Sequence, residues 1–335
     1  MTYQPKNMLV TGGAGFIGAN FVQYLLKHDS KVNIINLDLL TYAGSLDNLK
    51  DLPDESRHIF IKGDICDRHL IDQILREHNI DTIVHFAAET HVDRSITGPG
   101  AFVQTNVVGT FTLLEAARQY WLNEKKLIAS QCRFHHISTD EVYGTLSKTD
   151  PAFTETTPYA PNSPYSASKA GSDHLARAYF HTYGLPVTMS NCSNNYGPYQ
   201  HPEKFIPTVI NACRNWQSIP VYGDGSNIRD WLYVEDHCVA IDLIIKKGRV
   251  GESYNVGGDN ELTNLQVVDT ICGLMDELFS QNKSHKSLIS FVTDRLGHDW
   301  RYAIDYTKIH HELGWKPMTS FIQGIQQLIL TKGQL

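Results

Sequence analysis

Two short stretches of this sequence carry side chains that can move protons and hydride. Asp140 and Glu141 are adjacent carboxylates that follow Thr139, and Tyr165 and Lys169 form a Tyr-x-x-x-Lys pair downstream of them. Such a pair indicates hydride transfer to or from a carbinol, because a nearby ammonium lowers the pKa of a phenol. Two neighbouring carboxylates can act as an acid and a base when repulsion and unequal burial separate their pKa values. Oxidation combined with acid–base chemistry on neighbouring carbons predicts an elimination.

Both pairs also have structural interpretations. The tyrosine could begin a helix whose lysine is exposed, and the two acids could belong to a solvated loop or a helix start. On one helix, Tyr165 and Lys169 lie on the same face. To act as a base near pH 7, Tyr165 needs a pKa about 2–3 units below its ordinary value near 10. We expect the Lys169 ammonium and a positively charged cofactor ring to lower it together.

A glycine cluster near the N-terminus indicates where that cofactor binds. Gly12, Gly15 and Gly18 follow an apolar strand at residues 8–10 and open a helix. Their spacing permits a tight turn and the approach of a pyrophosphate to the amides at the helix N-terminus. Asp38 ends the second expected strand, where its carboxylate can accept hydrogen bonds from ribose hydroxyls and repel a 2′-phosphate. The pattern predicts NAD rather than NADP, although a capping aspartate beside a structural glycine turn would have the same spacing.

The elements that position these residues alternate between short apolar strands and amphipathic helices. The expected strands are residues 8–10, 32–37, 58–61, 82–86 and 134–137, and the main expected helices are residues 101–120 and 165–183. This alternation predicts an α/β fold, a Rossmann-type doubly wound parallel sheet with a smaller C-terminal substrate-binding lobe. We expect an NAD-binding domain at residues 1–190, with a returning segment near 228–256, and the lobe mainly at residues 191–335.

Composition narrows the classes of function. The chain has 335 residues and a formal net charge of −7, which argues against nonspecific nucleic-acid binding. No apolar run approaches the ~20 residues that cross a bilayer, so we expect no membrane segment and a cytoplasmic protein. The six cysteines are scattered without a Cys-x-x-Cys motif and indicate buried free thiols. Sixteen histidines form no grouping suited to a metal, and we expect no metal site.

The motifs together resemble the dTDP-glucose 4,6-dehydratases, a family of the extended short-chain dehydrogenases/reductases. The resemblance covers nearly the whole chain. Its segments are TGGAGFIG at 11–18, AAETHVDRSITGP at 87–99, HHISTDEVYG at 135–144, PYSASKAGSDHL at 164–175, NCSNNYGPY at 191–199, IRDWLYVEDH at 228–237, YNVGG at 254–258, and residues 294–305. The Thr-Asp-Glu run is the specific signal, since related epimerases share the glycine and Tyr-x-x-x-Lys motifs without it.

The resemblance implies a hydro-lyase reaction in three steps. Tyr165, assisted by Thr139 and Lys169, removes the C4 hydroxyl proton of dTDP-glucose while hydride leaves C4 for a tightly bound NAD. Glu141 then takes the C5 proton, which the new ketone makes acidic, as Asp140 protonates the departing C6 hydroxyl. Return of the hydride to C6 gives dTDP-4-keto-6-deoxyglucose, a precursor for deoxysugar biosynthesis.

The resemblance also implies the binding residues and the assembly. The cofactor residues are Gly12, Gly15, Phe16, Ile17, Gly18, Asp38, Leu39, Thr41, Asp64, Ile65, Phe86, Ala87, Ala88, Thr105, Tyr165, Lys169 and Asn195. The substrate residues are Thr90, Thr139, Asn194, Lys204, Phe205, Tyr222, Arg229, Asn264, Arg295 and His298. Arg229 and Arg295 are expected on the diphosphate, whereas Tyr222 either lines the base pocket or is a core residue. The long helices imply a homodimer.

Other functions stay open at this point. A UDP-sugar 4,6-dehydratase would share every motif, because the sequence does not separate thymidine from uridine. A nucleotide-sugar 4-epimerase or a sugar-acid decarboxylase would share the fold and the Tyr-x-x-x-Lys pair, but an epimerase has no task for Asp140 and Glu141. A catalytically silent NAD-binding protein need not keep Thr139, Tyr165 and Lys169 together.

Overall fold

The computed structural model of the chain describes residues 2–279, 283–294 and 299–331. Its centre is a seven-stranded sheet, ordered β10-β6-β5-β4-β1-β2-β3, in which every neighbouring pair is parallel. The strands are β1 (Asn7–Thr11), β2 (Asn33–Asp38), β3 (His58–Lys62), β4 (Thr82–His85), β5 (Arg133–Thr139), β6 (Val187–Cys192) and β10 (Ser253–Val256). The five expected strands are confirmed within one or two residues at each end, and the Rossmann-type α/β fold is confirmed with them.

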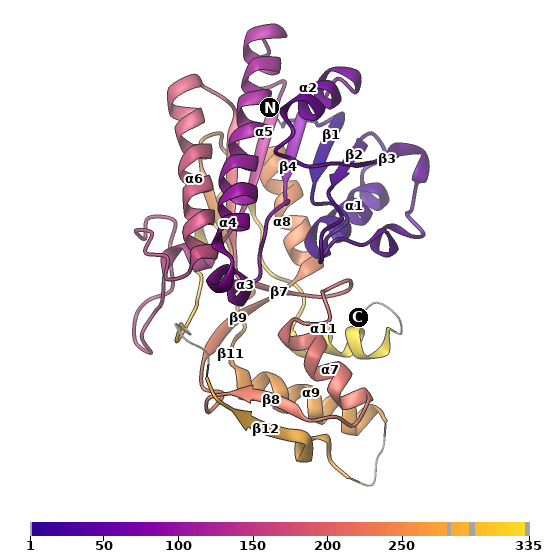
Figure 1. The fold of residues 1–335 in the computed structure, drawn as a ribbon, viewed down its shortest axis with the longest axis vertical. Coiled ribbons are helices and arrows are strands. Elements are labelled where there is room, and N and C mark those ends of the chain that lie inside the picture. The colour runs from indigo at the N-terminus through magenta and orange to yellow at the C-terminus, as the bar shows by residue number, and fades with distance from the viewer. Residues whose placement is uncertain (1, 280–282, 295–298, 332–335) are drawn as a thin grey trace.

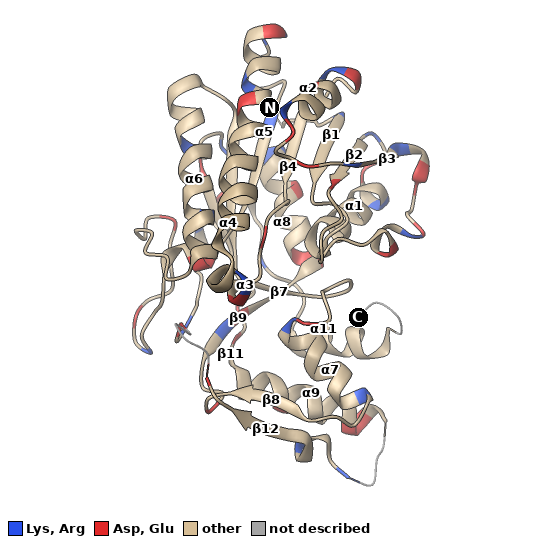
Figure 2. Ribbon diagram, in the orientation of Figure 1, with Lys and Arg blue, Asp and Glu red and all other residues tan. Residues whose placement is uncertain are grey.

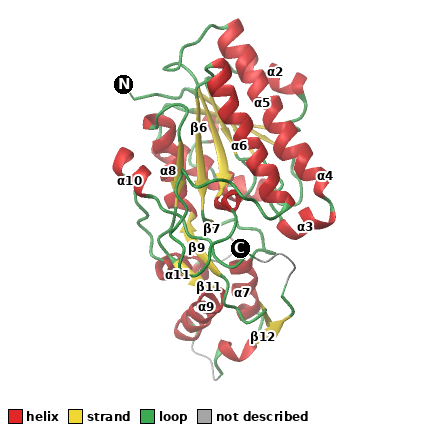
Figure 3. Ribbon diagram, turned by 90° about the vertical axis from the view of Figure 1, so that its left-hand side faces the viewer, coloured by secondary structure: helices red, strands yellow, loops and turns green. Residues whose placement is uncertain are grey.

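Helices cover both faces of this sheet because its buried strands alternate side chains between the faces. Met8 and Val10 of β1 pack against α1 (Phe16–His28) and α8 (Val234–Lys247). Leu9 belongs to the opposite core, which is completed by α2 (Arg68–Glu77), α5 (Thr110–Ala117) and α6 (Pro164–Tyr183). Figure 3 shows α5 and α6 side by side on one face of the sheet.

The two long helices differ in regularity. The expected helix at 165–183 is confirmed as α6, which begins at a capping box on Ser163 and ends at Gly184 with φ 70°. The expected helix at 101–120 is instead a composite of α4 (Pro99–Phe102), the π-helix η3 (Val103–Gly109), α5 and the π-helix η4 (Arg118–Glu124). Extra residues in π turns rotate the following side chains, which apolar periodicity over this length does not reveal.

A second, smaller unit lies beyond the carboxyl ends of the sheet strands (Figure 1). It holds a three-stranded sheet, ordered β11-β9-β7, and a parallel pair of β8 and β12. These strands are β7 (Asn194–Tyr196), β8 (Ile219–Tyr222), β9 (Ile228–Tyr233), β11 (Glu261–Thr263) and β12 (Ile289–Val292). Helices α7 (Phe205–Arg214), α9 (Asn264–Leu278) and α11 (Phe321–Leu330) share one apolar core with these strands. The chain returns from β9 through α8 and β10 to the large sheet before it enters β11.

The remaining short elements lie in the connections between these helices and strands. They are η1 (Leu46–Leu49), η2 (Glu55–Arg57), α3 (Val92–Thr97), η5 (Asp140–Tyr143), η6 (His285–Leu288) and α10 (Thr307–Leu313). Lys and Arg are interspersed with Asp and Glu over both units (Figure 2). The six cysteines form no disulfide and five of them are buried, which confirms the expected free thiols. Within the described part of the chain, no helix is both long and apolar enough to cross a bilayer.

Candidate active site

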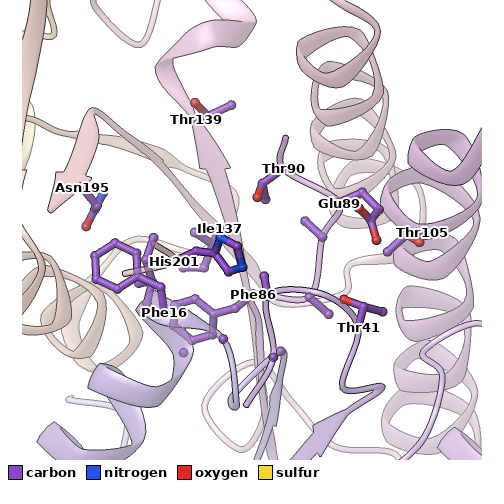
Figure 4. Close-up of a pocket in the computed structure, with 18 of the residues that line it drawn as sticks. Phe16, Thr41, Phe86, Glu89, Thr90, Thr105, Ile137, Thr139, Asn195 and His201 are labelled. Atoms are coloured by element: carbon purple, nitrogen blue, oxygen red, sulfur yellow. The ribbon is translucent and has the colours of Figure 1, made fainter. Parts of the chain in front are cut away.

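A cavity at the carboxyl edge of the large sheet gathers most of the residues expected to carry chemistry. Those lining it are Gly12, Gly15, Phe16, Ile17, Gly18, Asp38, Leu39, Thr41, Asp64, Ile65, Phe86, Ala87, Ala88, Thr90, Thr105, Thr139, Asp140, Glu141, Tyr165, Lys169, Asn194, Asn195 and Lys204. Figure 4 shows side chains from both halves of the chain around this space. Phe16, Thr41 and Phe86 come from the first half, and Asn195 comes from the second. The open α/β fold places ligands at this edge.

The glycine turn serves both the backbone and the cavity. A Cβ atom on Gly18 would lie 2.3 Å from the Gly12 carbonyl oxygen, so this glycine is required by packing alone. A Cβ on Gly15 would meet only that same oxygen, at 3.3 Å, yet Gly15 lines the cavity. Gly15 is also the N-cap of α1, and neither a side-chain cap nor an acidic residue occupies that first turn. The amides at the start of α1 therefore fit a pyrophosphate.

Asp38 is held in a fixed orientation at the end of β2. Its Oδ2 accepts a hydrogen bond from the Ala14 amide at 3.0 Å, and its Oδ1 accepts one from the Leu40 amide at 2.8 Å. The carboxylate thus caps two backbone segments, as the structural interpretation required, and it also lines the cavity. Each carboxylate oxygen has a second lone pair, so Asp38 can still accept from the hydroxyls of a ribose.

Tyr165 and Lys169 are both buried on the sheet-facing side of α6. The Lys169 Nζ donates to the Ile137 carbonyl oxygen at 2.7 Å, and the lysine is 5% exposed, so the interpretation of an exposed lysine is wrong. Burial lowers the pKa of Lys169. Burial, followed by the negative charge of Glu141, raises the pKa of Tyr165 well above its ordinary value. The expected depression of the Tyr165 pKa depends on a positively charged cofactor ring beside the phenol as well as on the Lys169 ammonium, so it stays a prediction.

Asp140 and Glu141 occupy different environments although they are adjacent. Both belong to η5, whose first turn is capped by Thr139, since the Thr139 hydroxyl accepts from the Glu141 amide at 3.3 Å. Asp140 is 1% exposed, and its Oδ2 has no hydrogen-bond partner among the described residues. Burial, followed by the charge of Glu141, raises the pKa of Asp140 well above its ordinary value. Glu141 is only partly buried and lines the same cavity. A buried carboxyl with a raised pKa thus stands next to a more accessible one.

A family model, curated relatives and solved structures match this chain over most of its length. The GDP-mannose 4,6 dehydratase family model matches residues 9–328. The dTDP-glucose 4,6-dehydratase of Xanthomonas campestris pv. campestris (strain B100) is 58% identical over 319 residues, covering 95% of this chain and 90% of that protein. The crystal structure of dTDP-glucose 4,6-dehydratase from Bacillus anthracis in complex with NAD has a TM-score of 0.85 and 48% identity, covering 97% of this chain and 95% of that chain. DesIV, the dTDP-glucose 4,6-dehydratase of Streptomyces venezuelae with NAD and TYD bound, has a TM-score of 0.86 and 46% identity, covering 96% and 95%.

This chain belongs to the dTDP-glucose 4,6-dehydratase family. The resemblance inferred from the motifs is thereby confirmed. As a member of this family, the chain carries the expected Thr-Asp-Glu run at the end of β5 and the Tyr-x-x-x-Lys pair on α6, and both face one cavity.

Four substrate residues expected from the dTDP-glucose 4,6-dehydratase family do not line the cavity. Arg229 is buried in β9, where its guanidinium donates to the Asp299 carbonyl at 2.9 Å and lies 4.3 Å from the ring centre of Tyr302. Phe205 begins α7, and Asn264 begins α9. Tyr222 ends β8 and is 45% exposed, so the interpretation as a core residue is wrong.

The roles of these four residues stay predictions. Arg295 and His298 lie outside the described residues, so their expected contacts also stay predictions.

Several cavity residues of this dTDP-glucose 4,6-dehydratase family member are absent from the sequence prediction. They are Tyr42, Ala43, Gly44, Glu89, Ile137, Ser138, Cys192, Ser193, Gln200 and His201, with Leu37 and Gly63 at the strand ends. Cys192 ends β6 and Ser193 follows it, and this strand was not predicted from the sequence. Applying to β6 the rule that strand ends face the ligand would have found both. Tyr42 and His201 come from loops and have no such signal.

The described residues contain no group of three or more His, Cys, Asp or Glu side chains that could hold a metal ion. The histidines within the sheet have other partners. His85 bonds with the Thr11 and Thr110 hydroxyls at 2.8 and 2.9 Å, and His135 bonds with Thr188 at 3.0 Å.

Proposed function

We propose that this protein is an NAD-dependent dTDP-glucose 4,6-dehydratase, which forms dTDP-4-keto-6-deoxyglucose and water. One observation carries the proposal: the buried carboxyl of Asp140, whose Oδ2 has no partner among the described residues, stands beside the more accessible Glu141 in the cavity that Tyr165 also lines. An elimination needs both an acid and a base, whereas a simple dehydrogenase or an epimerase needs neither of these carboxyls. The relatives that are 58% identical carry the name of this activity.

The cofactor follows from the same cavity. When bound, NAD supplies an acceptor for hydride from C4 and later a hydride donor to C6. The amides at the start of α1 and the side-chain-free position of Gly15 fit its pyrophosphate, and Asp38 fits a ribose that carries no 2′-phosphate. The related structures from Bacillus anthracis and Streptomyces venezuelae contain NAD, which supports the assignment.

Tyr165 and Thr139 act on the C4 hydroxyl in this proposal. Tyr165 takes the hydroxyl proton, and Thr139, which shares a side-chain hydrogen bond with the phenol, orients it. Because burial raises the pKa of Tyr165, the phenol stays protonated until positive charge enters the cavity next to it. Lys169 contributes a permanent part of that charge from its fixed place against Ile137.

Asp140 and Glu141 then divide the elimination. Glu141, the more accessible carboxyl, takes the C5 proton after C4 has become a ketone. Asp140 keeps a proton at neutral pH because burial raises its pKa, so it can protonate the departing C6 hydroxyl. The two adjacent groups thereby work on neighbouring carbons of one sugar.

We propose the same division of labour for the two units. Residues 1–190, with the returning segment near 228–256, hold NAD, and residues 191–335 mainly hold the nucleotide sugar. Asn194 and Lys204 already line the cavity on the lobe side. The remaining proposed substrate contacts are Phe205, Tyr222, Arg229, Asn264, Arg295 and His298. We place the two arginines on the diphosphate because a guanidinium group suits phosphate oxygens. The relative solved with TYD supports a thymidine nucleotide.

We also propose a cytoplasmic homodimer. Val103 and Val108 of η3 and Phe111 of α5 are 52%, 38% and 46% exposed, an unusual apolar surface for helices that already cover one sheet face. A second copy would bury this surface, and Phe111→Asp should then produce monomers in sedimentation velocity. The unbridged cysteines are consistent with a reducing compartment.

One assay tests the activity. Purified protein is incubated with dTDP-glucose and, separately, with UDP-glucose, and the 4-keto-6-deoxy product is followed by its alkaline absorbance. Product from dTDP-glucose is expected. Product from UDP-glucose alone would indicate a UDP-sugar 4,6-dehydratase, and a C4-inverted sugar that keeps its C6 oxygen would indicate an epimerase. NAD binding without turnover of either sugar would support a silent binding protein.

A further inference from the structure

Asp173 lies one helical turn beyond Lys169 on α6, on the same face of the helix. It is 2% exposed, and three donors surround its carboxylate. His136 Nε2 donates to its Oδ1 at 2.9 Å, while the Ser138 hydroxyl at 2.7 Å and the Tyr159 hydroxyl at 3.0 Å donate to its Oδ2. These donors satisfy the hydrogen-bonding capacity of a buried carboxylate and fix its orientation in the core.

The partners of Asp173 and of Lys169 alternate along β5. His136 and Ser138 bond to Asp173, and Ile137, which lies between them, accepts from the Lys169 Nζ. Three consecutive residues of β5 are thus tied to one face of α6. Thr139, the next residue of the strand, is the one that contacts the phenol of Tyr165 in the proposed reaction.

The network also reaches β6. The Asn191 side-chain amide donates to the Tyr159 hydroxyl at 3.2 Å and to the Thr139 carbonyl at 3.3 Å. Asp173 therefore stands at the centre of contacts that join α6, β5, β6 and the loop before α6. A change in the Asp173 carboxylate would therefore alter the contacts that hold the end of β5, which carries Thr139 and is followed by Asp140 and Glu141.

The charge of Asp173, one turn along α6, favours the charged form of Lys169. Burial alone would raise the pKa of Asp173, but hydrogen bonds from His136 and Ser138 and the positive charge of Lys169 lower it overall, which favours the anion. The other groups that face Lys169 are His85 on β4, His136 on β5, Cys192 on β6 and Tyr165 on its own helix.

Burial disfavours the charged form of each of those other groups. Burial holds the pKa of His85 well below its ordinary value and lowers that of His136. It raises the pKa of the Cys192 thiol to about 12 and keeps Tyr165 protonated. The negative charge of Asp173 opposes the cost of burying the Lys169 ammonium.

We propose that Asp173 is a positioning residue that holds Lys169 against β5 and keeps its ammonium charged inside the buried site. This inference rests on the proposed function, since it concerns the lysine of the same site. Asp173 touches neither cofactor nor substrate in this account and acts only through Lys169 and the end of β5.

Asp173→Asn tests the inference because it keeps the shape of the side chain and removes the charge. The pH dependence of kcat/KM for dTDP-glucose is measured for both proteins. We expect the alkaline limb, where Lys169 loses its proton, to move at least about 1 pH unit lower in the variant, the size of effect that a close opposite charge has. Above the limb, kcat/KM should fall about tenfold for each unit of displacement. Asp173→Ser should show the same displacement and replaces the first variant if that one does not fold.

Tyr159→Phe is the matched control. It removes one hydrogen bond to the Asp173 carboxylate but leaves its charge, so it should lower the melting temperature without moving the alkaline limb. An unmoved limb in Asp173→Asn and Asp173→Ser overturns the proposal, as does an equal displacement in Tyr159→Phe, which would reveal a purely structural role.

A second readout separates this inference from the proposed function. The Kd of NAD is followed by quenching of protein fluorescence as the pH is raised, with no sugar present. The loss of NAD affinity with rising pH should begin at least about 1 pH unit lower in Asp173→Asn than in the unsubstituted protein. If the unsubstituted protein does not turn over dTDP-glucose, the proposed function fails, while the NAD titration still decides the role of Asp173. Identical titrations of the two proteins would refute that role.

Discussion

Replacing Asp140 by asparagine should stabilise the protein and disable its chemistry at the same time. The side chain is 1% exposed, its Oδ2 has no partner among the described residues, and burial raises its pKa. Between the ordinary pKa and the raised one, the unfolded chain releases a proton that the folded chain keeps. Stability of the unsubstituted protein therefore falls by about 1.4 kcal/mol for each pH unit in that interval. Asparagine has no proton to release and escapes this loss.

The measurement is urea unfolding of both proteins without ligands, at about pH 5 and about pH 6. The free energy of unfolding of Asp140→Asn, relative to the unsubstituted protein, should increase by about 1.4 kcal/mol between the two. Groups common to both proteins cancel in this difference. Well below pH 4 the difference should no longer change with pH, because both states of the unsubstituted protein then hold the proton. A difference that stays flat with pH would show that Asp140 is ionised in the fold, and the assignment of the acid would be wrong.

Catalysis should respond in the opposite direction. General acids contribute roughly 10²–10⁴-fold to a rate, so kcat for the 4-keto-6-deoxy product should fall by about that factor in Asp140→Asn. Hydride transfer from C4 does not use this acid. Reduced cofactor should therefore accumulate in a single turnover, visible by its near-ultraviolet absorbance. Loss of that signal as well would mean that Asp140 serves the oxidation rather than the elimination.

Three further changes test the other parts of the site. Glu141→Gln should abolish exchange of the C5 hydrogen with deuterated water and lower kcat about 10²–10⁴-fold, and continued exchange would assign the base elsewhere. Asp38→Ser removes the charge that repels a 2′-phosphate, so the preference for NAD over NADP in binding should narrow at least about tenfold; an unchanged ratio would contradict the role of Asp38. Gly18→Ala forces a Cβ to within 2.3 Å of the Gly12 carbonyl and should cost about 1–3 kcal/mol of stability, whereas Gly273→Ala, with no atom within 4 Å, should stabilise by about 0.4–1 kcal/mol in the same thermal unfolding experiment.

Apolar strands were predictable because their side chains are buried on both faces of a parallel sheet. β6 escaped the prediction because its sequence, Val-Thr-Met-Ser-Asn-Cys, alternates apolar with polar residues. Thr188 and Ser190 are nevertheless fully buried, since both bond to the ring of His135 on β5. Hydrophobicity cannot reveal a strand whose polar side chains find their partners on the neighbouring strand.

The site was predictable in its membership but not in its electrostatics. Motif spacing placed Asp140, Glu141, Tyr165 and Lys169 in one cavity, because strand and helix ends meet at the carboxyl edge of the sheet. The sequence could not supply the degree of burial, which decides the sign of the Tyr165 pKa shift. The expectation counted the ammonium and the cofactor ring but not desolvation, which is the largest cause of the raised Tyr165 pKa in the protein without cofactor.

The lobe was the least predictable part. Its contacts come from loops, whose conformations follow no periodicity, so Tyr42 and His201 had no signal in the sequence. Tyr222 was predicted either to line the base pocket or to be a core residue, but it is exposed at the end of an edge strand.

The return of the chain to β10 limits how this enzyme can be rebuilt. A chimaera that joins the N-terminal part of one relative to the C-terminal part of another at residue 190 would import the outermost strand of the large sheet, together with α8, from the donor. That strand and helix would then have to fit β6 and α1 of the recipient. Grafting a new sugar specificity therefore calls for two exchanged segments, one on each side of residues 234–256, rather than a single crossover.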